Sequence, residues 1–338
     1  MKNDTPRKSN RILYATAAAS ALLAVAVFTV ALPITSAGAD QYQAVDTAAA
    51  VAAANWSEDV TITMDAEGNT FRFESNGMPN HAFAEQYLIP TNPNEQPFAD
   101  KSADAFAVVN SADYFVESPV DTTITTLPVY SDQVTDTSLG RIGVAISGAQ
   151  IFNDYENHER SVVAKDDQVI HDHVAFLDDC NGHTLVDGSD YHYHGIPECI
   201  TETVDQAGEH STMIGVLGDG FPVYGNQGQS GVIVTNDDLD ACSGHFDVTP
   251  EFPAGSYHYH LTADEAPYSI DCYHGEIEVS ANMGGGGPDF GAAATQLGVS
   301  QAELMEALGN SMPPDFEAAA ETLGISIDDL RAALPAPQ

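Results

Sequence analysis

One tetrapeptide, Tyr-His-Tyr-His, occurs twice in this chain, at residues 191–194 and 257–260. Alternating aromatic and imidazole residues favour an extended strand, on which successive side chains point to opposite faces. Both histidines of each copy therefore share one face. Residues two apart on a strand lie about 6.6 to 6.8 Å apart at Cα, and from that spacing two imidazoles can reach one metal ion. The alternative is that the histidines and tyrosines hydrogen-bond inside a polar core.

The two tetrapeptides belong to a longer internal duplication. Residues 142–152 align with residues 214–224, and in each half a cysteine, a glycine, a histidine, the tetrapeptide and a second cysteine follow in the same order. The repeats extend over about residues 142–199 and 214–272. A repeated order of this length indicates two related structural units.

Strand signals dominate the part of the chain that contains the duplication. Residues 60–64 alternate as a strand, residues 66–69 read as a turn and residues 70–74 return, which predicts a hairpin. The sequence has no long amphipathic helix pattern before residue 290. We therefore expect a mainly β fold, a sandwich or barrel built from two duplicated halves, with a small α-helical C-terminal tail.

The cysteines can be assigned to disulfides. The chain contains four, Cys180, Cys199, Cys242 and Cys272. Their spacing is not the CxxC pattern of zinc sites, and an even number of cysteines in an exported chain indicates disulfides. If the halves share a fold, each closes its own loop, so that the first two cysteines pair and the last two pair. The alternative joins equivalent cysteines across a pseudo-twofold axis.

The N-terminal segment has the pattern of an export signal. Basic residues precede an apolar run over residues 12–32, and small residues surround Gly38. We expect residues 1–39 to be a signal peptide cleaved before Asp40, or an N-terminal anchor if it is not cleaved. The protein would then be secreted, periplasmic or extracellular, and membrane-anchored in the uncleaved form.

Composition sets the remaining boundaries. Residues 40–59 are predicted to be an Ala-rich linker, 60–280 the main domain, 281–288 a Gly-rich linker, and 288–338 a helical tail of two 26-residue repeats. Each tail repeat has an Ala-rich helix that ends at glycine, and Ser300 or Ser326 is placed to cap a second helix. We expect the tail to contact an extracellular ligand or a cell-envelope partner.

The charge of the chain excludes two classes of partner. It contains 50 Asp and Glu against 10 Lys and Arg, for a formal net charge of −40. Such a chain repels nucleic acid and anionic membrane surfaces. The acidity is typical of a solvated surface on a secreted protein.

Several motifs together resemble a known family. They are residues 76–81, 92–94, 220–225, 239–245, the second tetrapeptide, and 268–275. Over about residues 60–280 the chain resembles the YHYH-motif proteins of bacterial secretomes. The resemblance implies a secreted YHYH domain and supplies no activity to assign, so whether the protein is an enzyme stays open. Residues 219–222 have the family's form, whereas residues 147–150 depart from it. We therefore expect the first half to be the degenerate copy, and we expect His258 and His260 to be the essential pair.

Histidines supply the candidate site. Histidine is the commonest metal ligand in proteins, and all-imidazole sites suit zinc or copper. The candidate ligands lie in repeat-equivalent or HxH positions: His171, His173, His183, His192, His194, His245, His258 and His260. We expect both tetrapeptide strands to contribute to one composite site, with the tyrosines in the core. The first hypothesis is a secreted metal-binding protein that uses paired HxH strands.

Two alternatives stay open. One is an enzyme, either a metal-dependent hydrolase or one in which Asp219, Asp190 or His194 acts as acid or base. The sequence contains no nucleophile elbow, HExxH motif or Walker loop that would name a reaction. The other is an extracellular glycan- or protein-binding module with structural histidines.

Overall fold

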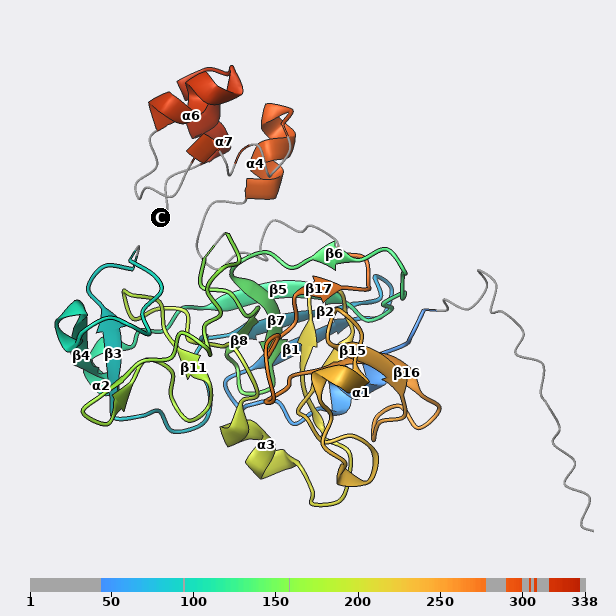
Figure 1. Ribbon diagram of the computed structural model, residues 1–338. Coiled ribbons are helices and arrows are strands. Elements are labelled where there is room, and N and C mark those ends of the chain that lie inside the picture. Colours follow the sequence, from blue (N-terminus) through green and yellow to red (C-terminus); the bar gives the residue numbers. More distant parts are fainter. Residues whose placement is uncertain are drawn as a thin grey trace, which may run out of the picture. The chain divides into compact units, whose positions relative to one another are not determined.

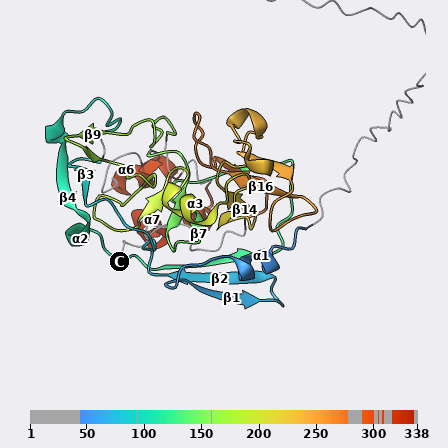
Figure 2. The same cartoon turned by 90° about the horizontal axis from the view of Figure 1, so that it is seen from below.

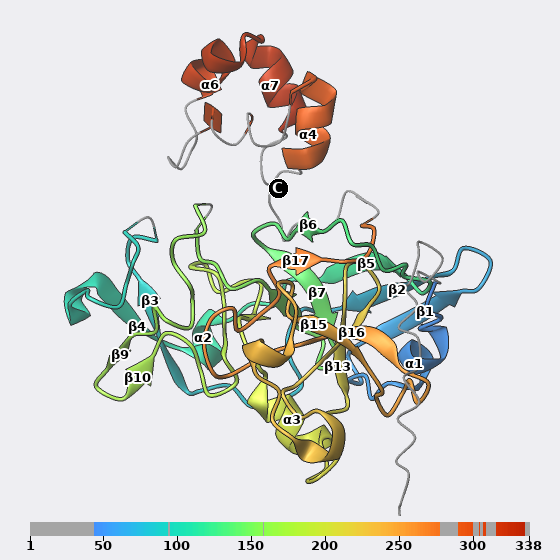
Figure 3. The ribbon, with the colours of Figure 1, turned by 45° about the vertical axis from the view of Figure 1, so that its right-hand side comes forward.

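The computed structural model describes residues 44–93, 95–157, 159–277, 290–299, 304, 307–308 and 316–334. Within these residues the protein is mainly β, as predicted (Figure 1, Figure 3). The predicted signal or anchor segment, residues 1–39, and the predicted Gly-rich linker, residues 281–288, lie outside them. Among the described residues, no helix combines the length and apolar character needed to cross a membrane.

An eight-stranded mixed sheet forms the centre of the domain. In spatial order its strands are β11 (Gly182–His183), β12 (His192–Tyr193), β8 (Gln150–Phe152), β7 (Arg141–Ala145), β13 (Met213–Leu217), β14 (Pro222–Tyr224), β16 (Ser256–His260) and β15 (Gly244–Asp247). The order is open, with β11 and β15 at the edges, so the sheet is not a closed barrel. Every residue of β7 and β13 is buried, as expected for apolar strands covered on both faces.

The strand pairing is the same in the two halves of this sheet. β7 and β8 form an antiparallel hairpin, β12 joins β8 in parallel, and β11 pairs antiparallel with β12. β13, β14, β16 and β15 repeat that arrangement. The halves meet where Val144 of β7 lies opposite Val216 of β13. These two valines are also equivalent in the sequence alignment, so the pairing is symmetric about this point.

The two Tyr-His-Tyr-His strands do not pair with each other. β8, β7, β13 and β14 lie between β12 and β16 in the sheet. The expectation of one composite site from both strands is therefore wrong. Each tetrapeptide strand is added to the outer side of its own hairpin, and the symmetric junction places the two outer sides far apart.

A smaller sheet covers one face of the central sheet (Figure 2). It is antiparallel and consists of β1 (Thr61–Asp65), β2 (Thr70–Ser75) and β5 (Val120–Thr125). Phe71 and Phe73 of β2 pack in one apolar cluster with Val144 and Val216. The domain is thus a sandwich at this point, and β1 with β2 confirms the predicted hairpin.

A short helix before this hairpin belongs to the same apolar cluster. In α1 (Ala48–Ala53), Ala50 and Val51 are buried against the residues of the smaller sheet. The described part of the Ala-rich segment that composition marks as a linker therefore packs on the domain. Alanine supplies both the helix propensity and the small volume for this close approach.

The remaining elements of the domain are short. They are β3 (Gln86–Pro90), β4 (Phe106–Asn110), β9 (Ile170–His171) and β10 (Val174–Ala175) in one sheet, β6 (Thr135–Asp136) and β17 (Cys272–Tyr273) in another, the helices α2 (Ser111–Tyr114) and α3 (Glu198–Val204), and the 3₁₀ turns Ala103–Ala105, Gln229–Gly231 and Asn236–Asp238. Leu88 of β3 packs with Phe98 and Phe176 from the neighbouring connections in a separate apolar cluster. That cluster forms a wall beside the site described below.

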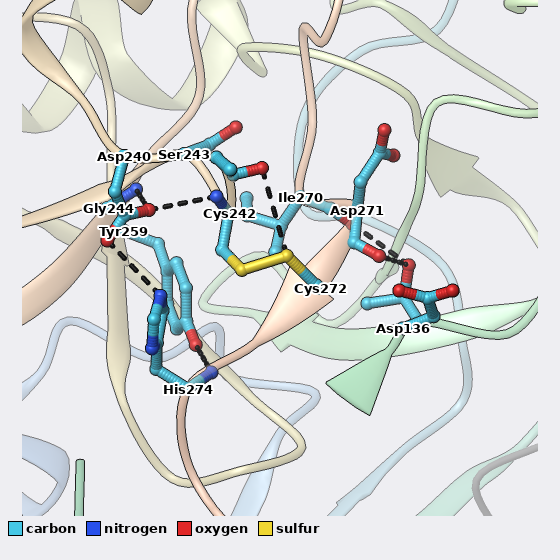
Figure 4. The surroundings of a disulfide bond; sticks show 12 residues. Asp136, Asp240, Cys242, Ser243, Gly244, Tyr259, Ile270, Asp271, Cys272 and His274 are labelled. Atoms are coloured by element: carbon cyan, nitrogen blue, oxygen red, sulfur yellow. Dashed lines mark hydrogen bonds and ion pairs between the residues drawn. A yellow bond between two sulfur atoms is a disulfide. The ribbon is translucent and has the colours of Figure 1, made fainter. Parts of the chain in front are cut away.

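Each half of the domain closes its own loop with a disulfide. Cys180 pairs with Cys199, and Cys242 pairs with Cys272, which confirms the pairing expected within the repeats. Figure 4 shows the second bond, where Cys272 on β17 lies beside Asp136 of β6. Loops of this size are stabilised by about 2 to 4 kcal/mol per disulfide.

The helical tail has a core of its own. Its described helices are α4 (Phe290–Leu297), α6 (Phe316–Leu323) and α7 (Ile327–Ala333). Ala294, Ala320 and Leu330 are buried in one apolar cluster. Ser326 caps α7 as predicted, because its side chain accepts a hydrogen bond from the backbone N–H of Asp329 at 3.0 Å.

The contact between the two sheets can be tested by removing one aromatic ring. Phe73 is fully buried, so Phe73→Ala should lower the free energy of unfolding by about 3 to 5 kcal/mol. Met64, on the paired strand β1, is 38% exposed, and Met64→Ala should cost less than about 0.5 kcal/mol. Urea denaturation measures both, and equal losses would contradict the sandwich.

Candidate metal centres

Three histidines of the first half form a compact group, here called the first histidine cluster: His183, His192 and His194. His183 of β11 lies directly opposite His192 of β12, and His194 follows one residue after that strand. Their ligating nitrogens all lie within 4.8 Å of one another. The Nε2 atoms of His192 and His194 are 3.0 Å apart. The alternation of the strand thus places both tetrapeptide histidines on one face, as predicted.

Backbone carbonyls fix the orientation of the two tetrapeptide imidazoles. His192 donates its Nδ1 hydrogen to the carbonyl of Asp190 at 2.6 Å, and His194 donates to the carbonyl of Asn153 at 2.6 Å. A carbonyl can only accept, so Nδ1 carries the hydrogen in both rings. In a neutral imidazole the lone pair is then on Nε2. Both lone pairs point into the cluster, which is the arrangement of metal-ligating histidines.

A carboxylate lies against this group. Glu156 Oε1 is 3.3 Å from His183 Nε2 and 3.2 Å from His194 Nε2, and the Glu156 side chain is only 13% exposed. Burial raises the pKa of Glu156, but His183 and His194 outweigh burial and lower it to about 2. Apart from these ion-pair contacts, Glu156 Oε1 and both ring nitrogens of His183 have no hydrogen-bond partner among the described residues.

A cavity of about 650 Å³ opens against the first histidine cluster. All three histidines and Glu156 line it. The other walls are largely apolar and come from separate parts of the chain: Ile89, Phe98, Leu139, Phe152, Phe176 and Leu185. The first half therefore presents its imidazoles to a space of small-molecule size.

Four histidines of the second half form the second histidine cluster: His210, His245, His258 and His260. His258 Nε2 lies 3.2 Å from His245 Nε2 and 3.1 Å from His260 Nε2. The ligating nitrogens of His210, His258 and His260 lie within 4.8 Å of one another. His258 and His260 are fully buried. This group is the counterpart of the first cluster near the opposite edge of the sheet.

The same kind of carbonyl contact orients the second cluster. His258 Nδ1 donates to the carbonyl of Ser256 at 2.9 Å, and His260 Nδ1 donates to the carbonyl of Gly225 at 2.5 Å. Gly225 is the sequence equivalent of Asn153, and Ser256 precedes His258 as Asp190 precedes His192. His210 Nδ1 likewise donates to the carbonyl of Ser211 at 2.7 Å. The two clusters thus share their supporting hydrogen bonds as well as their imidazoles.

Burial favours the neutral form of the four tetrapeptide imidazoles. Desolvation lowers the pKa of His194 to about 4, with an opposing contribution from Glu156, and lowers the pKa of His258 to about 3. Burial also lowers the pKa of His192 and of His260 well below the ordinary value. Neutral rings whose Nε2 lone pairs face each other at about 3 Å repel, because neither nitrogen has a hydrogen to donate. A bound cation removes this repulsion, so both nitrogen groups fit a metal ion.

The tyrosines of the tetrapeptides point to the opposite face and are core residues. Tyr193 contacts the hydroxyl of Ser147 at 3.0 Å, and Tyr259 donates to Asp219 Oδ2 at 2.7 Å. Burial raises the pKa of Asp219 to about 6, and the carboxylate also accepts from the N–H of Gly275. The departure of the first half from the family pattern at Ser147 is therefore on the tyrosine face, away from the histidines.

The candidate acid and base residues of the enzyme hypothesis do not come together. Asp219 is in the tyrosine core, whereas His194 is in the first histidine cluster. The Asp190 carboxylate accepts from Ser118 and Gln150, and its backbone carbonyl holds His192. These contacts give Asp190 a positioning role and leave no Asp–His pair among the three candidates.

The third HxH pair lies outside both clusters. His171 ends β9, and its ring centre is 5.7 Å from that of Phe106. His173 is in the following turn, with a φ of 70°. Two further groups, around Cys180 and Cys242, contain cysteines that are disulfide-bonded. Those sulfurs are not available as thiolate ligands.

Sequence reasoning missed Glu156 and His210. Glu156 lies in the connection after β8, and His210 precedes β13. The two are not equivalent in the duplication, so the repeat alignment carries no signal for either. Their closeness to the clusters is a property of the tertiary fold.

The fold and the site together define a β-sandwich protein with two separate clusters of buried imidazoles. Residues 121–232 and 229–275 match the family described as YHYH protein. The match identifies residues 121–275 as a YHYH domain, and this domain contains both histidine clusters, Glu156 and His210. No curated protein and no solved structure matches the chain.

The neutral state of His258 makes the metal-free protein sensitive to acid. Its pKa is about 3 when folded and near 6.5 when unfolded. Between these values the unfolded chain binds the extra proton, so stability present above about pH 6.5 is lost as the pH falls. After chelation, the wild type should lose more stability than His258→Gln between about pH 6.5 and pH 4. Denaturant unfolding at each pH measures the difference, and parallel curves would contradict it.

Proposed function

We infer that this protein binds transition metal ions at two separate sites, the first and the second histidine cluster. The observation that carries the proposal is the fixed orientation of the tetrapeptide imidazoles. Each Nδ1 hydrogen is held by a backbone carbonyl, and the Nε2 lone pairs converge at 3.0 to 3.1 Å. A structural histidine in a polar core would instead direct Nε2 at a hydrogen-bond partner, whereas the Nε2 atoms of His192 and His260 face other imidazole nitrogens.

The donor set favours zinc or copper. Imidazole nitrogen suits zinc, copper, nickel and iron, whereas calcium and magnesium prefer oxygen. The first site offers three imidazoles with Glu156 beside them, and the second offers the three imidazoles of His210, His258 and His260 with His245 beside His258. The chemistry supports a divalent ion of intermediate softness at both.

Export from the cytoplasm is part of the proposal. Two disulfides, Cys180–Cys199 and Cys242–Cys272, support an oxidising compartment. The formal charge of −40 supports a surface exposed to an aqueous, salt-containing medium. A secreted or periplasmic metal-binding protein accounts for both features.

Metal analysis of tag-free protein tests the two sites. Wild type should hold about two metal equivalents per chain, and His192→Ala/His194→Ala or His258→Ala/His260→Ala should each hold about one. Elemental analysis after gel filtration measures the content. Unchanged content in both double variants would refute the proposal.

The third HxH pair supplies a matched control. His171→Ala/His173→Ala removes two imidazoles at the same spacing but outside both clusters, and should leave the metal content unchanged. Because truncation of buried rings can impair folding, His192→Gln/His194→Gln and His258→Gln/His260→Gln should be measured in parallel. Circular dichroism establishes that each variant is folded before its metal content is compared.

A further inference from the structure

We propose that the first histidine cluster is an open metal site that binds a small molecule with a metal-coordinating head group and an uncharged, apolar body. The second histidine cluster is a closed site. This inference rests on the proposed function and assigns different roles to the two metal ions.

The cavity reaches the ligating groups of the first cluster directly. His183, His192 and His194 line it together with Glu156. A molecule in the cavity therefore contacts a metal ion held by these imidazoles. None of the four histidines of the second cluster lines this cavity.

The side chain next to the three grouped imidazoles also differs between the two clusters. In the second, His245 Nε2 lies 3.2 Å from His258 Nε2, so the neighbour is a fourth imidazole. In the first, the neighbour is a carboxylate, because Glu156 Oε1 lies against His183 and His194. Three protein imidazoles beside a cavity are the arrangement in which metal sites keep a position for an exogenous ligand. Glu156 is then placed to accept a hydrogen bond from the head group or from a metal-bound water.

The cavity walls define the rest of the ligand. Phe152 stacks on His192 with ring centres 3.7 Å apart, and Ile89, Phe98 and Leu139 add apolar surface. Among the described residues, those that line the cavity include carboxylates but no lysine or arginine. A negatively charged body would be repelled, so an anionic group is stabilised only at the metal. At about 650 Å³ the space takes a molecule well beyond the size of a single head group.

Hydroxamates of different length test the assignment on full-length, cobalt-loaded protein. Acetohydroxamate supplies the head group alone, and octanohydroxamate adds an apolar chain. Both should change the visible spectrum of cobalt, and octanohydroxamate should bind at least about tenfold more tightly because its methylenes enter the apolar cavity. The signal should persist in His258→Ala/His260→Ala and disappear in His192→Ala/His194→Ala.

A cavity-filling variant separates the body from the head group. Leu185 is 40% exposed and lines the cavity, so Leu185→Trp should fold and bind two metals. It should retain acetohydroxamate affinity within about threefold and lose the advantage of the longer chain. Val232 is 67% exposed and is not part of the lining, and Val232→Trp should behave as wild type.

The outcomes distinguish this inference from the proposed function. If two metals bind but neither hydroxamate changes the cobalt spectrum, the open site is refuted and metal binding stands. If both hydroxamates bind equally, the apolar body is refuted. If no metal binds at either cluster, the proposed function fails, and this inference fails with it.

Discussion

The hydrogen bond from a histidine Nδ1 to a backbone carbonyl is the constraint on which both sites depend. It fixes both the ring orientation and the tautomer. The Nε2 lone pair is then the part of the ring that can ligate a metal ion. For His194 and His260 the acceptors are Asn153 and Gly225, which directly follow the hairpin strands β8 and β14. The parallel pairing of each tetrapeptide strand with its hairpin brings these carbonyls into position. Sheet topology therefore determines the imidazole geometry.

The symmetric junction at Val144 and Val216 explains why there are two sites. Pairing β7 with β13 buries the most apolar strands at the centre of the sheet and leaves the tetrapeptide strands outside. Each cluster then takes its fourth polar neighbour from a different connection, Glu156 in one half and His210 in the other. The two halves share the imidazoles that lie on or next to their strands. They differ in the residue that the connections add, which is Glu156 in the first half and His210 in the second.

Local alternation and the internal repeat were enough to predict several features of the fold and of the histidine clusters. Alternation predicted the hairpin of β1 and β2, the repeated order predicted which cysteines pair, and strand periodicity placed the tetrapeptide histidines on one face. Long-range placement could not be predicted in this way. A repeat alignment does not say whether two strands pair or lie apart, and it cannot identify Glu156 or His210, which have no repeat partner. His171 and His173 share the HxH spacing, but nothing local shows that a turn carries them away from the clusters.

The separation of β12 from β16 has an electrostatic consequence. Five inter-strand steps of about 4.8 Å place the two clusters about 24 Å apart along the sheet. Ions at the two proposed sites would be too far apart for one small ligand to bridge, and salt would screen most of the repulsion between them because the distance is about three Debye lengths. Filling one site therefore leaves the affinity of the other nearly unchanged. If the clusters bind metal as proposed, each half of the molecule loses, exchanges or replaces its ion independently of the other half.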